Sequence, residues 1–224
     1  DGDCCSIGAA HWIHAIRYNM NLTVILHDNH VYGLTKKQAS PTSPMGFKSN
    51  TTPRGAVLEP LNPLLVSLGV ANASFIAQGV DWMPEQLYDI IHKAFKHRGF
   101  SFVRVIQRCP EFLPKMFEPW LHDPGKTLLL THANGLRPSA EVSRTYRNQR
   151  EHDPLDIHTA REIASCEDPI PVGILFHDPS VPCYEDLRHA GAPRSPGLTQ
   201  AGLDAELDKY TIWPEVEADS ARAA

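Results

Sequence analysis

The sequence predicts an α/β fold with a mostly parallel sheet and helices on both faces. Two continuous apolar runs, Leu22–Leu26 and Phe100–Ile106, have the composition of strands buried on both faces of a parallel sheet. Helical spacing of apolar residues precedes each run, over residues 9–20 and 81–99. Strands that alternate with helices in this way form layered α/β domains.

Local signals define the elements in the first half of the chain. Ala9, Ile13, Ile16 and Met20 share one face of a helix that begins near Cys4 and ends near Asn19. A long polar loop with five prolines is expected over residues 35–63. The next expected elements are a helix at Pro63–Ala71, a strand at Ser74–Ala77, and a helix that starts at Asp81–Pro84, buries Leu87, Ile90, Ile91, Ala94 and Phe95, and ends at Gly99.

The character of the sequence changes after about residue 111, where proline, histidine and charged residues become frequent. A helix is expected near 156–165 and one more strand at Val172–Phe176. The segment after about residue 186 is rich in alanine, proline and acidic residues. We therefore expect it to be extended or mobile.

Composition argues against several classes of partner. A net charge of −5 gives no electrostatic reason to expect binding to nucleic acid or to an anionic membrane surface. No apolar run approaches the ~20 residues of a membrane-spanning helix, and no signal peptide is visible. The five cysteines contain no C-x-x-C pair, so a disulfide framework is not expected and a cytoplasmic location fits better.

Polar residues stand at the ends of two expected strands. Asp1 closes one strand and Asn29 the next, so a βαβ unit places both at one edge of the sheet. The helix from Cys4 directs backbone N–H groups toward the same edge. An acid, an amide and the Val31 carbonyl are suitable oxygen ligands for a Mg²⁺ ion that carries a diphosphate. Taken singly, Asp1 reads better as a helix cap and Asn29 as a turn residue; together they favour the metal.

Two motifs carry a family resemblance. DGDCCSIGAAHWIHAIRYN and VILHDNHVYGLTKKQASPTSP resemble the β subunits of 2-oxoacid:ferredoxin oxidoreductases, which bind thiamine diphosphate. The family pattern is Gly-Asp-Gly-Asp, followed by Asp/Asn-Asn-x-x-Tyr-Gly-x-Thr-x-x-Gln-x-Ser-Pro-Thr. The likeness continues to about Pro110 and is weaker over Pro171–Asp186. We read the chain as N-terminally truncated, with a glycine expected just before Asp1 and a C-x-x-C farther upstream.

The resemblance implies a role for each matching residue. The implied magnesium ligands are Asp1, Asn29 and the carbonyl of Val31. The implied cofactor-binding set is Asp1, Gly2, Asp3, Cys4, Asn29, Val31, Tyr32 and Gly33, and the implied catalytic or substrate set is Leu34, Thr35 and Lys36. Lys36 can also be read as a solvated surface lysine. Gln38, Ser40 and Thr42 are expected to order the loop, and Lys37 replaces the usual glycine.

Cys109 follows an apolar strand and precedes Pro110. From its surroundings alone it reads as a small buried apolar residue. The resemblance instead implies the fourth ligand of a [4Fe–4S] cluster, whose other ligands lie upstream of this chain. His11 and His14, three residues apart on the first helix, are expected to pack or hydrogen-bond rather than bind metal.

The resemblance implies an enzyme subunit that decarboxylates a 2-oxoacid oxidatively to acyl-CoA and CO₂, with electrons passing through the cluster to ferredoxin. The implied partners are an α subunit, ferredoxin, coenzyme A and a 2-oxoacid; the loop after Ser40 and the Lys36–Lys37 pair favour 2-oxoglutarate over pyruvate. The expected division is a thiamine diphosphate- and magnesium-binding domain over 1–110, a C-terminal part over 111–185 and a tail over 186–224. A non-redox thiamine diphosphate decarboxylase or synthase, and a non-catalytic scaffold, are the alternatives.

Overall fold

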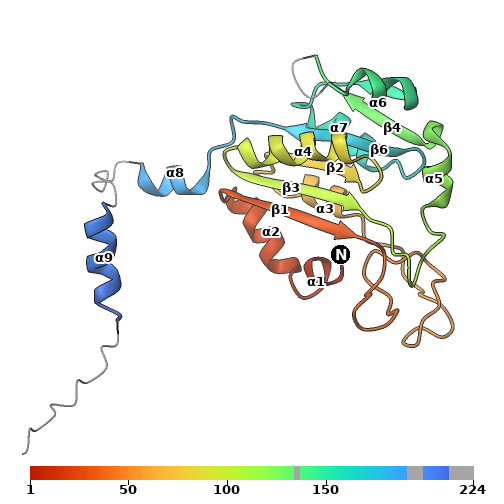
Figure 1. Ribbon diagram of the computed structural model, residues 1–224, viewed down its shortest axis with the longest axis horizontal. Coiled ribbons are helices and arrows are strands. Elements are labelled where there is room, and N and C mark those ends of the chain that lie inside the picture. Colours follow the sequence, from red (N-terminus) through yellow and green to blue (C-terminus); the bar gives the residue numbers. More distant parts are fainter. Residues whose placement is uncertain (134–136, 191–198, 212–224) are drawn as a thin grey trace, which may run out of the picture. The chain divides into compact units, whose positions relative to one another are not determined.

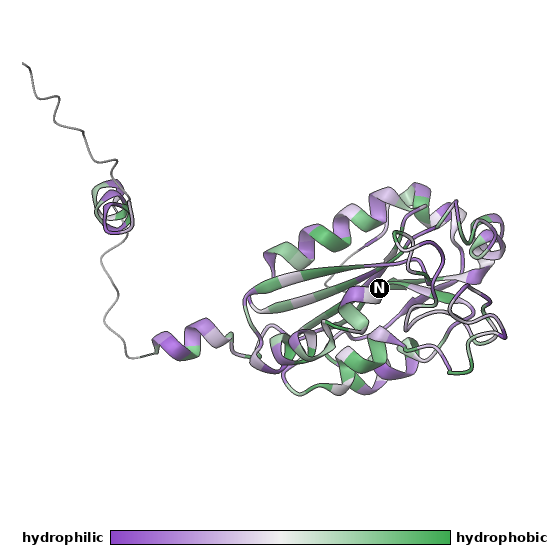
Figure 2. Ribbon diagram, turned by 90° about the horizontal axis from the view of Figure 1, so that it is seen from below, coloured by the Kyte–Doolittle hydropathy of each residue, from purple (hydrophilic) through white to green (hydrophobic). Residues whose placement is uncertain are grey.

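The computed structural model describes residues 1–133, 137–190 and 199–211. The chain divides into two compact units, Asp1–Leu187 and Arg188–Ala224. The first unit holds a six-stranded sheet flanked by helices on both faces, so the predicted fold class is confirmed (Figures 1 and 2). The second unit contains helix α9 (Gln200–Asp208), which the sequence analysis did not foresee. The division at residues 110 and 185 stays a prediction.

The strands are β1 (Leu22–Asp28), β2 (Phe75–Val80), β3 (Phe100–Ile106), β4 (Thr127–Thr131), β5 (Gln149–Glu151) and β6 (Ile170–His177). The helices of the first unit are α1 (Gly2–Cys5), α2 (Ala9–Tyr18), α3 (Pro63–Gly69), α4 (Pro84–Lys96), α5 (Glu118–His122), the 3₁₀ turn η1 (Pro124–Lys126), α6 (Ala140–Thr145) and α7 (Ile157–Ala164). Helix α8 (Tyr184–His189) spans the boundary between the two units. None of the helices formed by the described residues combines the length and the apolar character needed to cross a bilayer.

The strand order is β1-β3-β2-β6-β4-β5. Strands β1, β3 and β2 run parallel, β6 runs antiparallel to β2, and β4 is parallel to both β6 and β5. The carboxyl ends of β1, β2 and β3 therefore meet at one edge of the sheet. Helices α2, α3 and α7 contribute to the apolar cluster on one face, and α4 contributes to the cluster on the other.

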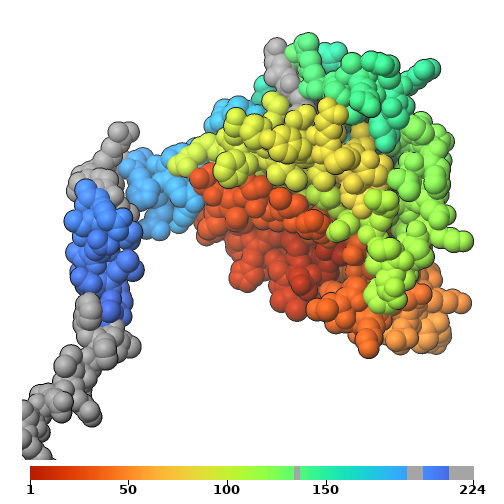
Figure 3. Space-filling model, viewed as in Figure 1, coloured from red at the N-terminus to blue at the C-terminus, as the bar shows by residue number. Residues whose placement is uncertain are grey.

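The loop between β1 and α3 extends from that edge (Figure 1). It contains no helix or strand over residues 29–62, which matches the long polar loop predicted for 35–63. In the space-filling view this loop, drawn in orange, forms one continuous surface with the N-terminal residues, drawn in red (Figure 3). The long loop and the N-terminus therefore belong to the same region of the molecule.

The prediction that the strand at Leu22–Leu26 is buried on both faces is wrong. Among the described residues β1 is the last strand of the sheet and pairs only with β3. Leu22 and Ile25 are 44% and 39% exposed. Apolar composition alone does not distinguish an edge strand from a central one, whereas β3, the other predicted strand, is buried along nearly all of its length.

The buried faces of two helices also differ from prediction. The single helix expected from Cys4 is two helices, α1 and α2, and α2 buries Trp12, Ala15 and Ile16 while Ile13 is exposed. In α4 the buried residues are Gln86, Ile90 and Ala94, and Phe95 is exposed. In both cases the wide apolar face read from the sequence includes residues at its margin, and the structure leaves those in solvent.

Candidate functional site

The N-terminal residue lies beside the carboxyl end of β1. The Asp1 backbone nitrogen donates a hydrogen bond to the carbonyl of His27 over 2.6 Å. The Asp1 carboxylate accepts a 2.8 Å hydrogen bond from the hydroxyl of Thr42. Since His27 precedes Asn29 by two residues, Asp1 and Asn29 lie at the same edge of the sheet, as the sequence predicts. Their role as metal ligands stays a prediction.

Asn29 opens a tight turn. Its side-chain oxygen accepts a 3.2 Å hydrogen bond from the backbone N–H of Val31, which is buried. That oxygen keeps a second lone pair for another ligand. The residue between them, His30, has a φ of +62°, which non-glycine residues rarely adopt. The turn is therefore held in one shape at the point where the sequence places two magnesium ligands.

Gly2 and Tyr32 connect the two motifs. The Tyr32 hydroxyl donates a 3.1 Å hydrogen bond to the carbonyl of Gly2. A Cβ atom on residue 2 would lie 2.0 Å from Cε1 of the Tyr32 ring. Residue 2 must be glycine for this ring to pack, a constraint that the sequence pattern alone did not reveal. The nearby Asp3 is exposed and Cys4 is half-buried; a hydrogen bond with Cys5 lowers the pKa of the Cys4 thiol to about 7.

The sequence analysis missed the residue with the most buried charge in this region, Asp28. Its carboxylate pairs with Arg104 at 2.7 Å and accepts a 2.7 Å hydrogen bond from Thr42. Burial alone would raise the pKa of Asp28, but the charges of Arg104 and His30 and these hydrogen bonds lower it below its usual value. The available signal was an arginine inside the apolar run Phe100–Ile106, because a charge in a buried strand needs a partner.

A short buried segment fixes the loop over this site. The backbone N–H of Ser40 donates to the Ser43 hydroxyl over 2.8 Å, and that hydroxyl donates to the His30 carbonyl over 2.6 Å. Ser40 and Thr42 hydroxyls lie 3.3 Å apart, and all three side chains are buried. The segment therefore closes over the end of β1 through side-chain hydrogen bonds, in keeping with a loop-ordering role for Ser40 and Thr42.

The predicted substrate residues stand apart from this buried network. Leu34, Thr35 and Lys36 are exposed, with Leu34 98% exposed. They lie in a turn closed by the bridge between Tyr32 and Gln38. The structure therefore groups Leu34, Thr35 and Lys36 at a surface tip, and their contribution to catalysis stays a prediction.

The same tip contains two strained lysines. Lys36 and Lys37 have φ values of +66° and +70°. This is the conformation that glycine adopts most easily, and Lys37 occupies the position where the resembled pattern has glycine. The Lys37 ammonium lies 5.9 Å from the centre of the Phe47 ring, a cation–π contact that helps to hold the strained turn.

Cys109 is buried and free, just after β3, where its carbonyl accepts a hydrogen bond from Leu113. Among the described residues no group of three or more His, Cys, Asp or Glu side chains is arranged to hold a metal ion. Cys109 can therefore supply one ligand to a cluster and no more from this part of the chain. All five cysteines are free thiols, so no disulfide is present, as predicted.

A cavity of about 160 Å³ adjoins the buried network. Its polar wall comes from His30, Thr42, Gln78 and Arg104, and part of its apolar wall comes from Phe117. Burial lowers the pKa of His30 to about 4, so this histidine is neutral at pH 7. The cavity thus shares His30 and Thr42 with the loop that closes over Asp1.

Two family descriptions match the chain. The thiamine pyrophosphate enzyme, C-terminal TPP binding domain matches residues 1–105, and the C-terminal part of the pyruvate ferredoxin oxidoreductase beta chain matches residues 142–190. The first match covers all the residues of the site described above, apart from Cys109 and Phe117. Fold and match together define a domain of the thiamine pyrophosphate-binding class.

Named relatives and a solved structure narrow this class. The 2-oxoglutarate oxidoreductase subunit KorB of Mycobacterium tuberculosis is 42% identical over 53% of this chain and 31% of its own length. A 2-oxoacid:ferredoxin oxidoreductase subunit beta from Sulfolobus sp is 34% identical over 86% of this chain and 60% of its own length. A 2-oxoglutarate:ferredoxin oxidoreductase from Magnetococcus marinus, solved with 2-oxoglutarate, coenzyme A and succinyl-CoA bound, superposes with a TM-score of 0.68 at 29% identity, covering 95% of this chain and 66% of that one.

The chain belongs to the β-subunit family of the 2-oxoacid:ferredoxin oxidoreductases, as its two motifs predict. It spans 31% and 60% of the length of the two relatives named above.

Proposed function

We propose that the chain holds the Mg²⁺–thiamine diphosphate of a 2-oxoacid:ferredoxin oxidoreductase, in which a 2-oxoacid and coenzyme A give acyl-CoA and CO₂. One observation carries the proposal: Asp1 is bonded to the end of β1 at His27, two residues before Asn29. Ligands bind outside the carboxyl ends of strands in open α/β sheets. The match to a thiamine pyrophosphate-binding domain over residues 1–105 supports this choice of ligand.

The donor set fits magnesium. Asp1 and Asn29 offer a carboxylate and an amide oxygen, and the Val31 carbonyl is the proposed third ligand; all three are the hard oxygen donors that Mg²⁺ prefers. None of the ion pairs among the described residues involves Asp1, so its carboxylate charge is not neutralised by a basic side chain there. A divalent cation would supply the missing positive charge.

When bound, thiamine diphosphate supplies the carbanion that attacks the 2-oxoacid carbonyl and the electron sink that lets CO₂ leave. The contribution of this chain is to bind and orient. Asp1, Asn29 and Val31 fix the diphosphate end through the metal, and Gly2, Asp3, Cys4, Tyr32 and Gly33 line the cofactor. Leu34, Thr35 and Lys36, exposed on their turn, are proposed to face the 2-oxoacid, with the Lys36 ammonium binding a carboxylate.

The partners follow from the exposed side of the site. We propose an α subunit that covers the exposed turn and a [4Fe–4S] cluster that takes Cys109 as one ligand. Electron transfer to ferredoxin is the corresponding step of the whole enzyme. The match of residues 142–190 to an oxidoreductase β subunit favours this reaction over a non-redox decarboxylase. A cytoplasmic location is consistent with five free thiols.

The proposed substrate is 2-oxoglutarate. One of the relatives named above is a 2-oxoglutarate oxidoreductase subunit, and the solved neighbour contains 2-oxoglutarate with coenzyme A. Lys36 and Lys37 offer two exposed cations, which suits a substrate with two carboxylates.

The experiment is an assay of the complete subunit with its α partner. With 2-oxoglutarate, coenzyme A and a viologen dye, the expected result is dye reduction that requires Mg²⁺ and thiamine diphosphate. Pyruvate should be the poorer substrate. Dye reduction with pyruvate but not with 2-oxoglutarate would contradict the substrate, and the absence of reduction with any 2-oxoacid would contradict the reaction.

A further inference from the structure

The Thr42 hydroxyl lies between two carboxylates. Its oxygen is 2.8 Å from Oδ2 of Asp1 and 2.7 Å from Oδ1 of Asp28. The side chain is 1% exposed, so water does not compete for these contacts. A hydroxyl has a single hydrogen and can donate it to one carboxylate at a time. The arrangement therefore links the two acids through one group.

Asp28 is fixed independently of Thr42. Nε of Arg104 donates to Asp28 over 2.7 Å, and a terminal nitrogen of the same guanidinium is also 2.7 Å from the carboxylate. Arg104 donates further to Gln78 over 3.2 Å, and Gln78 donates to the Pro171 carbonyl over 2.7 Å. Asp28 is thus anchored through side chains of β3 and β2 to the backbone of β6.

Asp1 has much less support. Within the described part of the chain, the side-chain hydrogen bond to its carboxylate comes from Thr42, and the backbone bond to His27 holds only its main chain. A carboxylate on a free Cα–Cβ axis can rotate among several orientations. The orientation of this acid is therefore set by Thr42, and the place of Thr42 is set by Asp28.

We propose that Arg104, Asp28 and Thr42 are positioning residues that fix the Asp1 carboxylate for the divalent cation. The inference rests on the proposed function and deepens it. The Arg104–Asp28 pair holds the Thr42 hydroxyl in place, and Thr42 binds one oxygen of Asp1 while the other oxygen stays available to the metal. Groups that orient a metal ligand in this way typically contribute about 10–100-fold to metal affinity.

The test measures Mn²⁺ binding to the complete subunit with its α partner in the presence of thiamine diphosphate, by electron paramagnetic resonance of the free ion. Thr42→Val should weaken Mn²⁺ binding by about 10–100-fold. Thr42→Ser keeps the hydroxyl and should stay within about threefold of the parent affinity. If the valine variant is not recovered as folded protein, Thr42→Ala replaces it, with thermal unfolding as the check on folding.

Ser43→Ala is the matched control. Ser43 is buried in the same segment and binds the His30 carbonyl, but it has no hydrogen bond to Asp1. Its loss should loosen the loop and leave Mn²⁺ affinity near the parent value. A double-mutant cycle adds a second readout: in an Asp1→Asn background, Thr42→Val should cause little further loss, because the two residues act through one carboxylate.

The outcomes separate the two ideas. A parent complex that binds no Mn²⁺ with thiamine diphosphate contradicts the proposed function itself. A parent complex that binds, together with a Thr42→Val variant of equal affinity, overturns the positioning role alone. The same conclusion follows if Ser43→Ala weakens binding as much as Thr42→Val, or if the losses of Asp1→Asn and Thr42→Val simply add.

Discussion

At the scale of single residues, the contact between Gly2 and Tyr32 joins the two sequence motifs most directly. The ring lies where a side chain on residue 2 would begin, 2.0 Å from the position of a Cβ atom. The hydroxyl of the same ring binds the Gly2 carbonyl. The glycine of the first motif and the tyrosine of the second are therefore one structural unit, although 30 residues separate them.

This contact gives the first prediction. Gly2→Ala should destabilise the protein by about 1–3 kcal/mol, because the ring must leave its site or the backbone must shift. Tyr32→Ala in the same chain should recover much of that loss by making room for the methyl group. Chemical denaturation of the four proteins of the cycle measures both effects. Additive losses would show that Gly2 and Tyr32 do not clash as described.

Lys37 gives a second prediction with an unusual sign. Because its φ of +70° is costly for lysine, Lys37→Gly should raise the free energy of unfolding by up to about 1 kcal/mol. Lys37→Ala keeps the unfavourable φ and loses the contact with the Phe47 ring, so it should lower stability by about 0.5 kcal/mol. Thermal unfolding compares the two; a glycine variant less stable than the alanine variant would refute the strained conformation.

The sequence was informative for residues that belong to a motif and uninformative for residues that act through a partner. Asp1, Asn29 and Val31 follow from strand ends and from a resemblance, and the structure places them at one edge. Asp28 and Arg104 lie 76 residues apart, and only the pairing of β1 with β3 brings them together. Such a pair has no local pattern, apart from a charged residue within a buried strand.

At the scale of elements, Asn19 joins several parts of the first unit. It ends α2 with a φ of +50° and is completely buried. Its side-chain oxygen accepts from the Ser74 hydroxyl and the Phe100 backbone, before β2 and at the start of β3, and its amide nitrogen donates to the carbonyls of Val181 and Pro182. The end of α2, two strands and the segment after β6 therefore depend on one side chain.

The third prediction follows from these bonds. Asn19→Ala should reduce the free energy of unfolding by about 2–4 kcal/mol, since buried donors and acceptors lose their partner. Asn72 is a matched control: it also has a positive φ, of +67°, but is exposed and donates one hydrogen bond to the Arg17 carbonyl. Asn72→Ala should cost about 1 kcal/mol or less. Equal losses in urea denaturation would exclude a special role for Asn19.

Element prediction from the sequence succeeded where the apolar signal was long. Strand β3 and helices α3 and α7 lie close to their predicted bounds. Strands β4 and β5 and helices α5 and α6 were missed, because each is short and is surrounded by prolines, histidines and charges that resemble loop composition. Strand β1 was found, but its edge position was not, because strand order is a tertiary property.

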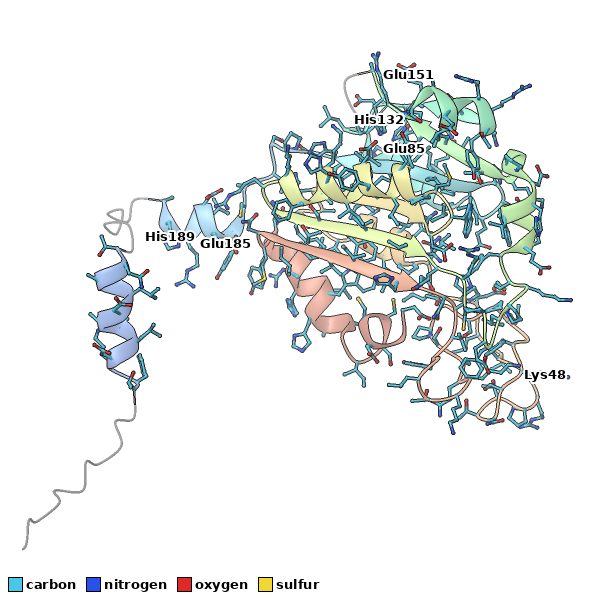
Figure 4. All side chains as sticks on the ribbon, in the orientation of Figure 1. Lys48, Glu85, His132, Glu151, Glu185 and His189 are labelled. Atoms are coloured by element: carbon cyan, nitrogen blue, oxygen red, sulfur yellow. The ribbon has the colours of Figure 1, made fainter. Side chains whose placement is uncertain are left out.

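At the scale of the whole molecule, four histidines gather at the sheet edge opposite the Asp1 site. His97 follows α4, His132 follows β4, His152 follows β5 and His177 ends β6; ring centres are 5.1 Å apart for His97 and His177, and 4.7 Å for His132 and His152. Figure 4 labels His132 at this edge. Burial lowers the pKa of all four, to about 4 for His97 and His132.

These shifts give the fourth prediction. A histidine whose pKa is lower in the folded state binds its proton more readily when unfolded, so stability is lost as pH falls from about 6.5 toward 4. Between pH 7 and pH 5 the free energy of unfolding should fall by at least about 1 kcal/mol. His132→Phe should reduce this dependence, because among the described residues neither ring nitrogen of His132 has a hydrogen-bond partner. Urea denaturation at both pH values measures it, and an unchanged slope in the variant would contradict the assignment.

The central claim for the whole molecule is that Asp1 and Asn29 jointly bind a divalent cation. The most direct measurement is anomalous diffraction from crystals of the complete subunit with its α partner, grown with thiamine diphosphate and Mn²⁺ in place of Mg²⁺. The account predicts a manganese peak about 2.1–2.2 Å from the Asp1 carboxylate, the Asn29 amide oxygen and the Val31 carbonyl. A manganese peak bound elsewhere, with Asp1 and Asn29 free of metal, would contradict it.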